Sequence, residues 1–533
     1  MAQCVFRLFS IVLLVASALG GRYAWAGKAS TIVYCAEGSP QTFNPALSID
    51  ATTHHLNKDI YNRLVRLSVD DGKVEPDLAE SWTVSDDGKV IQFRLRKNVS
   101  FHTTEYFKPT RKLNADDVVF SFLRQLKKDH PFHLVGDGKY LMFQSNGLDK
   151  VIEDVVKVSD LEVKFILNKP FAPLLPLLSA IPMGITSKEY ADHLAAADKK
   201  VDYDQKPVGT GPMIFKSYVP DQRIRLTANP QYFLGKPKFD QFVFEIVPEG
   251  NVRMQMMRVG SCHIAFNPPV ETLKYLKDEP QLQVVKRPGV NVGYVGLNIK
   301  KRPFDNVKVR QALNYALNRE AYIKAIYHDN AKLADTPLSA VSWAHKVYDN
   351  RYSYDLAKAK QLLKEAGFPN GFSTELWTLP IDRPYIPNGK KLGEMIQADL
   401  AKLNISVRLV SYDWGTYLEK SEKGEHHMVM LGWMSDLGDP DIMLGNNLSC
   451  NTRFNVSQWC DKSFQALLEK ARSTNDQAER QKMYQEAIGI FIDQAPWIPI
   501  AHGNYTRVIS QKLKGYKFSS YGYDIFDDAR IEF

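Results

Sequence analysis

Acidic side chains gather in one segment of the sequence, directly after a short apolar run. The run covers residues 427–431, and Trp433, Asp436, Asp439 and Asp441 follow it. Such a run, followed by Gly, Asp and Pro, is typical of a buried strand that ends in a tight loop. Groups that contact a ligand in α/β layers lie where strands end. These carboxylates could therefore bind a ligand. A lone Asp after a strand, however, more often caps a turn. Asp439 and Asp441 lie on either side of a proline and are expected to cap the next helix.

A cationic candidate lies in another loop. Arg383 belongs to residues 380–387, a segment that three prolines stiffen. The planar guanidinium of Arg can donate two parallel hydrogen bonds to one carboxylate. Taken alone, Arg383 could equally form a surface ion pair, and the neighbouring Tyr385, like Trp433, could belong to the core. Residue types alone thus suggest that Arg383 and the carboxylates are oppositely charged candidates, but they do not indicate a function.

Catalytic and metal-binding patterns are missing from the sequence. It contains no Gly-x-Ser-x-Gly, no His-Glu-x-x-His and no Cys-x-x-Cys. His102, His426 and His427 are not at ligand spacing, so each is expected to make a structural hydrogen bond. A secreted hydrolase is therefore only a weak alternative, and we predict a protein that is not an enzyme and has no resident cofactor or metal.

The bulk composition is that of a folded protein with more than one core. The chain has 533 residues, of which 44% are apolar and 24% charged, and its net charge is +8. This length predicts about three structural units. The positive charge is spread along the chain and is not interleaved with aromatic residues, so nucleic-acid binding is not expected.

The N-terminus has the pattern of a cleavable secretion signal. Arg7 precedes an apolar stretch at 8–19, and Ala24 and Ala26 provide the small residues before a cleavage point. We expect residues 1–26 to be removed, so that the mature chain begins at Gly27. No other apolar run is long enough to cross a bilayer. These features predict export to the periplasm and a protein that is not embedded in the membrane.

Four cysteines remain once Cys4, within the signal, is removed. An even number of cysteines in an oxidising compartment favours disulfides. Of the three possible pairings, Cys450 with Cys460 is local and leaves Cys35 with Cys262. The second bond would tie the first strand to a segment far along the chain, which makes the first domain discontinuous.

Local signals predict the elements that position these residues. Asp-Asp-Gly at 70–72 and at 86–88 is typical of hairpin turns. Asn114, followed by Asp116 and Asp117, predicts a helix start. From about residue 290 onward strands and helices alternate, which predicts an α/β domain. Strands are expected at 31–35, 90–95, 162–167, 224–226, 242–247, 291–298, 405–410 and up to Trp433, and helices at 188–199, 306–327, 355–366, 390–403, 416–423 and 477–492.

Several of these segments resemble a known family. Residues 76–82, 93–96, 114–120, 207–212, 309–313 and 432–433 are similar to motifs of the extracytoplasmic peptide-binding proteins of peptide-uptake ABC transporters, the family 5 solute-binding proteins. Residues 106–111, 383–385, 425–426 and 438–441 and the two cysteine pairs resemble the dipeptide-binding branch. The resemblance runs from about Thr31 to the C-terminus.

The resemblance implies a two-lobed α/β periplasmic binding protein fold with a hinge and an extra domain. It implies a monomer that captures short peptides, dipeptides above all, between its lobes and delivers them to an inner-membrane ABC permease. The implied division is 27–61, 211–288 and 507–533 for domain I, 62–210 for the extra domain II, and 289–506 for domain III.

The resemblance also assigns roles to the charged candidates. Asp436 is expected to bind the peptide ammonium and Arg383 the peptide carboxylate, while Trp433, Tyr385, Gly432 and Met434 are expected to line the pocket. Met434, Ser435 and Leu437 replace smaller or more polar residues of the family pattern, which could change the preferred peptide. Longer or antimicrobial peptides and haem, carried by other members of this group, are the alternative cargoes.

Overall fold

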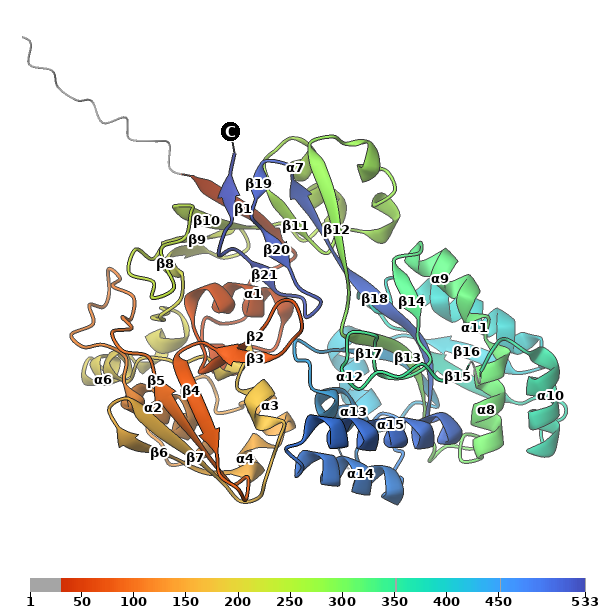
Figure 1. Cartoon of the computed structure of the whole chain (residues 1–533). Coiled ribbons are helices and arrows are strands. Elements are labelled where there is room, and N and C mark those ends of the chain that lie inside the picture. The colour runs from red at the N-terminus through yellow and green to blue at the C-terminus, as the bar shows by residue number, and fades with distance from the viewer. Residues whose placement is uncertain (1–29, 350–351, 451, 533) are drawn as a thin grey trace, which may run out of the picture.

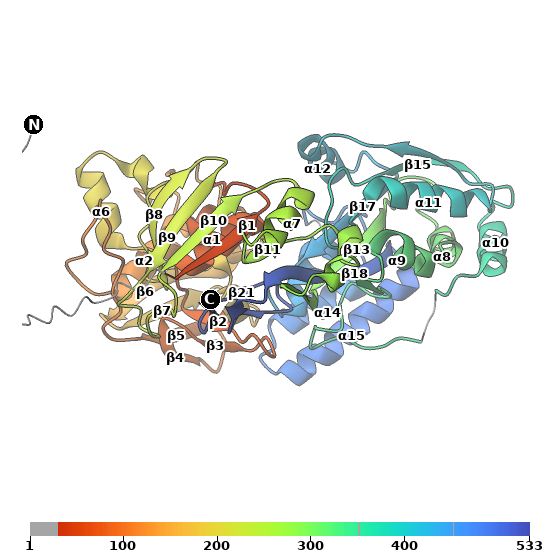
Figure 2. The same ribbon diagram turned by 90° about the horizontal axis from the view of Figure 1, so that it is seen from above.

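The structure is a computed structural model that describes residues 30–349, 352–450 and 452–532. The predicted signal at 1–26 and the expected first mature residue, Gly27, lie outside these ranges. For description we call the described residues between 289 and 506 the C-lobe, and all other described residues the N-lobe. In both views the two lobes lie side by side, with the long strand β18 (Trp497–Ser510) passing from one into the other (Figures 1 and 2).

The N-lobe contains part of a sheet that it shares with the C-lobe, one four-stranded sheet, three two-stranded sheets and short helices. Its elements are β1 (Thr31–Ala36), α1 (Ala51–Ile60), β2 (Val65–Leu67), β3 (Val74–Pro76), β4 (Ala79–Val84), β5 (Val90–Leu95), α2 (Ala115–Leu126), α3 (Leu141–Ser145), α4 (Leu148–Val151), β6 (Ile152–Ser159), β7 (Glu162–Leu167), α5 (Leu174–Leu177), α6 (Lys188–Ala196), β8 (Met213–Val219), β9 (Arg223–Ala228), β10 (Gln241–Ile246), α7 (Gly250–Arg258), β11 (Ile264–Phe266), β12 (Leu282–Pro288), β19 (Leu513–Lys514), β20 (Lys517–Phe518), β21 (Asp524–Ile525) and β22 (Arg530–Ile531). The strand β22 packs beside β1 (Figure 1).

The C-lobe alternates strands and helices, as predicted. Its elements are β13 (Asn291–Leu297), α8 (Val307–Ala316), α9 (Arg319–Tyr327), β14 (Ala331–Leu333), α10 (Leu356–Glu365), β15 (Ser373–Trp377), α11 (Gly389–Ala401), β16 (Ser406–Val410), α12 (Trp414–Glu422), β17 (Met428–Met434), α13 (Pro440–Leu448), α14 (Lys462–Arg472), α15 (Gln477–Gln494) and most of β18. The single helix predicted over 306–327 is wrong. Leu317 is extended and the side chain of Asn318 caps a second helix, so the segment forms α8 and α9.

Local sequence signals in the N-lobe are confirmed. The two Asp-Asp-Gly segments join β2 to β3 and β4 to β5, and Gly72 and Gly88 have φ of 69° and 67°, which favours glycine. Asn114 and Asp117 form a reciprocal capping box at the start of α2. These turns and caps depend on neighbouring residues only, which is why the sequence predicted them.

One long sheet runs through both lobes. Its order is β16-β15-β17-β13-β18-β11-β1-β10-β9-β8, and β12 and β14 also pair with β18. The first half of β18 pairs with β13 and β14, and its second half pairs with β11 and β12. The chain therefore crosses between the lobes at Gly289–Val290 and again within β18, close to Gly503.

Hydrophobic side chains form a separate core in each part of the molecule. One core lies in the C-lobe and three lie in the N-lobe, around β5 and α2, around β1 and β10, and around Cys35, Cys262 and α7. Leu437 and Ile442, from the C-lobe, pack into the core around β5 and α2. The backbone of Arg472 also accepts a hydrogen bond from the N–H of Ala172 at 2.7 Å. The lobes are thus in contact along α13.

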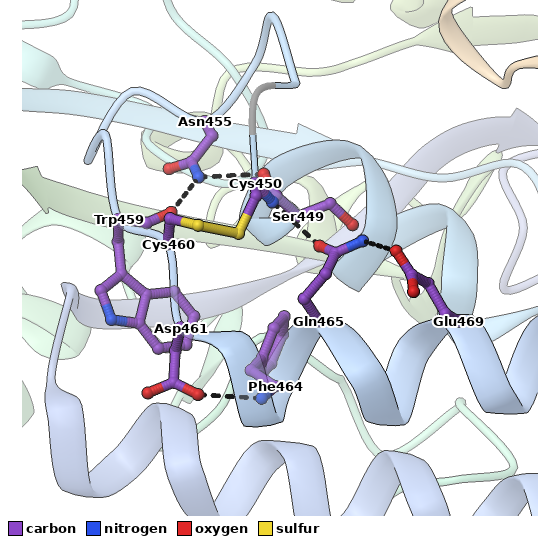
Figure 3. Close-up of a disulfide and its surroundings, with 9 residues drawn as sticks. All are labelled: Ser449, Cys450, Asn455, Trp459, Cys460, Asp461, Phe464, Gln465 and Glu469. Atoms are coloured by element: carbon purple, nitrogen blue, oxygen red, sulfur yellow. Dashed lines mark hydrogen bonds between the residues drawn. A yellow bond between two sulfur atoms is a disulfide. The ribbon is translucent and has the colours of Figure 1, made fainter.

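Both predicted disulfides are present. Cys35 in β1 is bonded to Cys262, and Cys450 is bonded to Cys460. Around the second bond, Asn455 donates to the carbonyls of Ser449 and Trp459, and Gln465 accepts from the N–H of Cys450 at 3.0 Å (Figure 3). The local disulfide therefore closes a hydrogen-bonded loop between α13 and α14.

Candidate ligand-binding site

A glycine surface on the C-lobe sheet supports the loop that carries Arg383. Gly432 in β17 pairs with Gly293 in β13, next to β18, which contains Gly503. A Cβ at Gly432 would lie 2.3 Å from the ring of Tyr385, and one at Gly503 would lie 2.0 Å from the carbonyl of Pro384. Only glycine leaves room here for a second layer of backbone. Gly432, which was predicted to line the pocket, thus lies directly beneath the ring of Tyr385 and supports it.

The Arg383 loop is fixed by its own hydrogen bonds. Arg383 and Ile386 exchange two backbone hydrogen bonds of 3.0 Å, and the hydroxyl of Tyr327 donates to the carbonyl of Tyr385 at 2.6 Å. The guanidinium carbon of Arg383 lies 5.8 Å from the centroid of the Trp414 ring. Burial raises the pKa of Tyr385, and the nearby Arg383 guanidinium opposes this rise. Among the described residues, no carboxylate lies within 4.0 Å of this guanidinium.

The three carboxylates after β17 have different surroundings. Asp439 caps α13 and forms a buried ion pair of 2.8 Å with Arg480. Asp441 pairs with Arg472 at 2.9 Å. Both were expected to serve the next helix, and the structure places them at its start. In the described part of the chain Asp436 has no Lys or Arg partner, which distinguishes it from the other two.

Two N-lobe side chains reach Asp436. The hydroxyl of Tyr523 donates to Oδ2 of Asp436 at 3.0 Å, and Nδ1 of His54 lies 3.8 Å from the same oxygen. The pKa of Tyr523 is raised far above its usual value, first by burial and then by the Asp436 carboxylate. Asp436 therefore lies at the contact between the lobes, with 22% of its side chain exposed.

Tyr505, in β18, connects the surroundings of the two charged candidates. Burial raises its pKa most, and Asp436 and Tyr385 raise it further, while Asn291 and Arg507 lower it. The pKa of the Tyr505 phenol thus responds to both Asp436 and Tyr385.

Trp433 and Tyr385 lie on opposite faces of β17. Tyr385 covers the face to which a Cβ at Gly432 would point, and adjacent residues of a strand point to opposite faces. Trp433 packs against Phe454 with ring centroids 5.0 Å apart, and its buried Nε1 has no hydrogen-bond partner among the residues that the structure describes. Met434, at the end of β17, is 39% exposed.

The remaining histidine candidates make structural hydrogen bonds. His102 contacts the carbonyl of Gly211 at 2.9 Å, and His426 contacts that of Val456 at 3.0 Å. Burial lowers the pKa of each to about 4. His427 lies 3.2 Å from the hydroxyl of Thr374. Within the described ranges there is no group of three or more His, Cys, Asp and Glu residues that could hold a metal ion.

A cavity of about 440 Å³ is lined by β12, by the turns between β11 and β12, and by His328 at the end of α9. Its lining residues do not include the predicted site residues.

Three residues of this site could not be predicted from the sequence. His54, Tyr505 and Tyr523 lie in α1, in β18 and just before β21, whereas Asp436 follows β17. No motif or spacing connects these segments. Only the folded chain brings them together.

The sequence was compared with known families. It matches the model described as bacterial extracellular solute-binding proteins, family 5 Middle, over residues 73–455, which is more than half of the chain. The chain belongs to this family. This confirms the family resemblance and the predicted binding-protein fold.

Similar proteins in this family cover nearly the whole chain. The dipeptide-binding protein of Escherichia coli K12 is 42% identical, with 95% of each chain covered. Heme-binding protein A of Haemophilus influenzae is 41% identical, covering 94% of this chain and 92% of that protein. A solved dipeptide binding protein from Pseudoalteromonas, in complex with Met-Leu, has a TM-score of 0.84 and 36% identity, covering 94% of this family 5 chain and 100% of that one. The described part of the chain has no helix long and apolar enough to cross a membrane.

Proposed function

We propose that this family 5 protein captures short peptides, dipeptides above all, and delivers them to an inner-membrane ABC permease. Arg383 binds the peptide carboxylate and Asp436 binds the peptide ammonium. The observation that carries this proposal is that, among the described residues, Arg383 has no Asp or Glu partner and Asp436 has no Lys or Arg partner, whereas Asp439 and Asp441 each pair with an arginine. The names of the similar proteins, two of which are dipeptide-binding proteins, support it.

The chemistry of a dipeptide fits this pair of charges. A dipeptide is a zwitterion with a fixed distance between its ends and variable side chains, so a receptor for many dipeptides must bind the ends. Arg suits a carboxylate because of its planar pair of donors, and Asp suits an ammonium that has only donors. A ligand without one terminal charge leaves its partner buried and unpaired, which costs about 3–5 kcal/mol.

The two crossings between the lobes form the hinge in this proposal. Closure around a peptide would then be a bending at Gly289–Val290 and at Gly503 within β18, as in other binding proteins. In this proposal domain I comprises 27–61, 211–288 and 507–533, domain II comprises 62–210, and domain III comprises 289–506. The protein works as a monomer in the periplasm after removal of residues 1–26, and it requires no metal, resident cofactor or nucleic acid.

Calorimetry of ligand-free, refolded protein tests the proposal. The titrants are an unblocked dipeptide, its N-acetylated form, a pentapeptide and haem. Tight binding of the free dipeptide alone supports recognition of both charged ends. Equal binding of the acetylated form or the pentapeptide would contradict it, and binding of haem alone would favour the cargo named for the Haemophilus influenzae relative. Turnover of the dipeptide during titration would instead revive the hydrolase alternative.

A further inference from the structure

The hydrogen bonds of His54 determine which of its ring nitrogens carries the proton. Nε2 of His54 lies 3.2 Å from the carbonyl oxygen of Ser48. A carbonyl oxygen can only accept, so Nε2 must be the N–H donor. In the neutral imidazole the other nitrogen, Nδ1, is then an acceptor with a free lone pair.

This acceptor faces a second acceptor. Nδ1 of His54 lies 3.8 Å from Oδ2 of Asp436, which is longer than a hydrogen bond. Their side chains are only 16% and 22% exposed. The hydroxyl of Tyr523 already donates to Oδ2 of Asp436, which fixes the orientation of the carboxylate. Two mostly buried acceptors at this separation call for a donor that can contact both.

We propose that His54 Nδ1 is the second acceptor for the ammonium of the bound peptide. The inference rests on the proposed function and extends it. One N–H of the ammonium donates to Asp436 and another to His54, while Tyr523 positions the carboxylate.

The partners of Asp436 are held by a buried network in the N-lobe. His55, next to His54 in α1, lies 3.3 Å from Asp524, and Asp524, next to Tyr523, accepts a hydrogen bond of 2.9 Å from Arg507. His55 and Asp524 thus belong to the buried network, while their sequence neighbours His54 and Tyr523 contact Asp436. The ammonium site is complete only while the N-lobe and the C-lobe are in contact.

Protonation of His54 would remove the acceptor. The titratable and charged groups of this network are Asp436 from the C-lobe, with Tyr523 on the same carboxylate oxygen, Asp524 and Arg507 behind His55, and His55 and Lys58 on the same helix. A proton on Nδ1 turns His54 into a cation that pairs with Asp436 and competes with the ammonium. Peptide affinity should therefore be full while His54 is neutral and should fall as the pH is lowered.

Calorimetry with Ala-Ala between pH 5.5 and 8.5 tests this inference. For the wild type we expect the Kd to rise about tenfold from high to low pH, because a proton on Nδ1 removes the second acceptor for the ammonium. His54→Asn keeps an acceptor close to the position of Nδ1 but cannot be protonated, so its affinity should vary less than about threefold over the same range. His54→Leu removes the acceptor and should weaken binding about tenfold at pH 8.5.

The control is His193→Gln, at an exposed position in α6, which should behave as the wild type. Thermal unfolding of each variant separates loss of binding from loss of folding. If the wild type binds Ala-Ala tightly and both His54 variants reproduce its affinity and pH dependence, the role of His54 is overturned while the proposed function stands. If the wild type does not bind Ala-Ala, the proposed function itself fails.

Discussion

The side-chain amide of Asn291 forms two hydrogen bonds with the backbone of Gly503, one from its nitrogen and one to its oxygen, each 2.8 Å long. Asn291 begins β13, directly after the first crossing between the lobes, and Gly503 lies in the second crossing. The side-chain amide therefore joins the two crossings with a pair of hydrogen bonds, like the pair that two opposite residues exchange in an antiparallel sheet. Asn291 is completely buried.

Replacement of Asn291 should destabilise the protein. Asn291→Ala leaves the N–H and the carbonyl of Gly503 unpaired in a buried place, which should cost about 1–3 kcal/mol of unfolding free energy. Urea unfolding measures this change. Asn168→Ala, which removes one exposed hydrogen bond to Lys150, should change stability by less than about 0.5 kcal/mol. Equal stability of the two variants would contradict a clamp at the crossings.

Arg383→Ala should lower dipeptide affinity about a hundredfold, on the order of 3 kcal/mol, because the peptide carboxylate loses its only cation in the proposed site. Calorimetry with an unblocked dipeptide measures the change. The matched control is Arg408→Ala on β16, where an exposed Arg pairs with Glu375. Its affinity should equal that of the wild type. Near-native binding by Arg383→Ala would remove Arg383 from the site.

Asp436 and Asp439 should respond differently to the same substitution. Asp436→Ala should weaken dipeptide binding about a hundredfold with little change in stability, because its partner is the ligand. Asp439→Ala leaves the buried Arg480 unpaired and should cost about 3–5 kcal/mol of stability. Calorimetry and thermal unfolding of both variants measure the contrast. Similar effects of the two substitutions would show that Asp436 is structural.

Gly432→Ala should displace the Arg383 loop, because the new side chain projects from the sheet into the space that Tyr385 occupies. The new Cβ would meet the ring of Tyr385 and the carbonyl of Val292 at 2.5 Å or less, which should cost about 1–3 kcal/mol and also lower dipeptide affinity. Gly489→Ala in α15 is the control, since its Cβ would meet nothing within 4 Å and should stabilise the helix by about 0.5–1 kcal/mol. Unchanged affinity in Gly432→Ala would mean that the loop tolerates displacement.

Reduction of both disulfides should lower the melting temperature and leave the ligand preference unchanged. The bond between Cys35 and Cys262 closes a sequence separation of 227 residues, and such a bond stabilises by up to about 5 kcal/mol in the chain-entropy model. Thermal unfolding and calorimetry with and without a reductant provide the test. A change of specificity on reduction would show that the cysteines shape the site.

The sequence predicted those features that depend on neighbouring residues. The turns at Gly72 and Gly88, the cap at Asn114 and the role of Asp439 all follow from short patterns, and the structure has them. The break between α8 and α9 was missed because apolar spacing continues through it, and only the cap at Asn318 marks it.

The site itself was less accessible to sequence reasoning. Period-two alternation could place Trp433 opposite Gly432, but nothing in the sequence indicates that Tyr385 covers Gly432. Likewise, the contacts of His54 and Tyr523 with Asp436 depend on tertiary packing between distant segments.

The position of β22 beside β1 has a practical consequence for measuring motion. Because both strands belong to the N-lobe, labels attached to β1 and to β22 would move together during any bending between the lobes. A fluorescence donor and acceptor placed there would keep a constant separation, so their energy transfer would not change when the lobes bend. A useful sensor of peptide capture needs one label in the C-lobe, for example on an exposed position of α10, and one near either chain end.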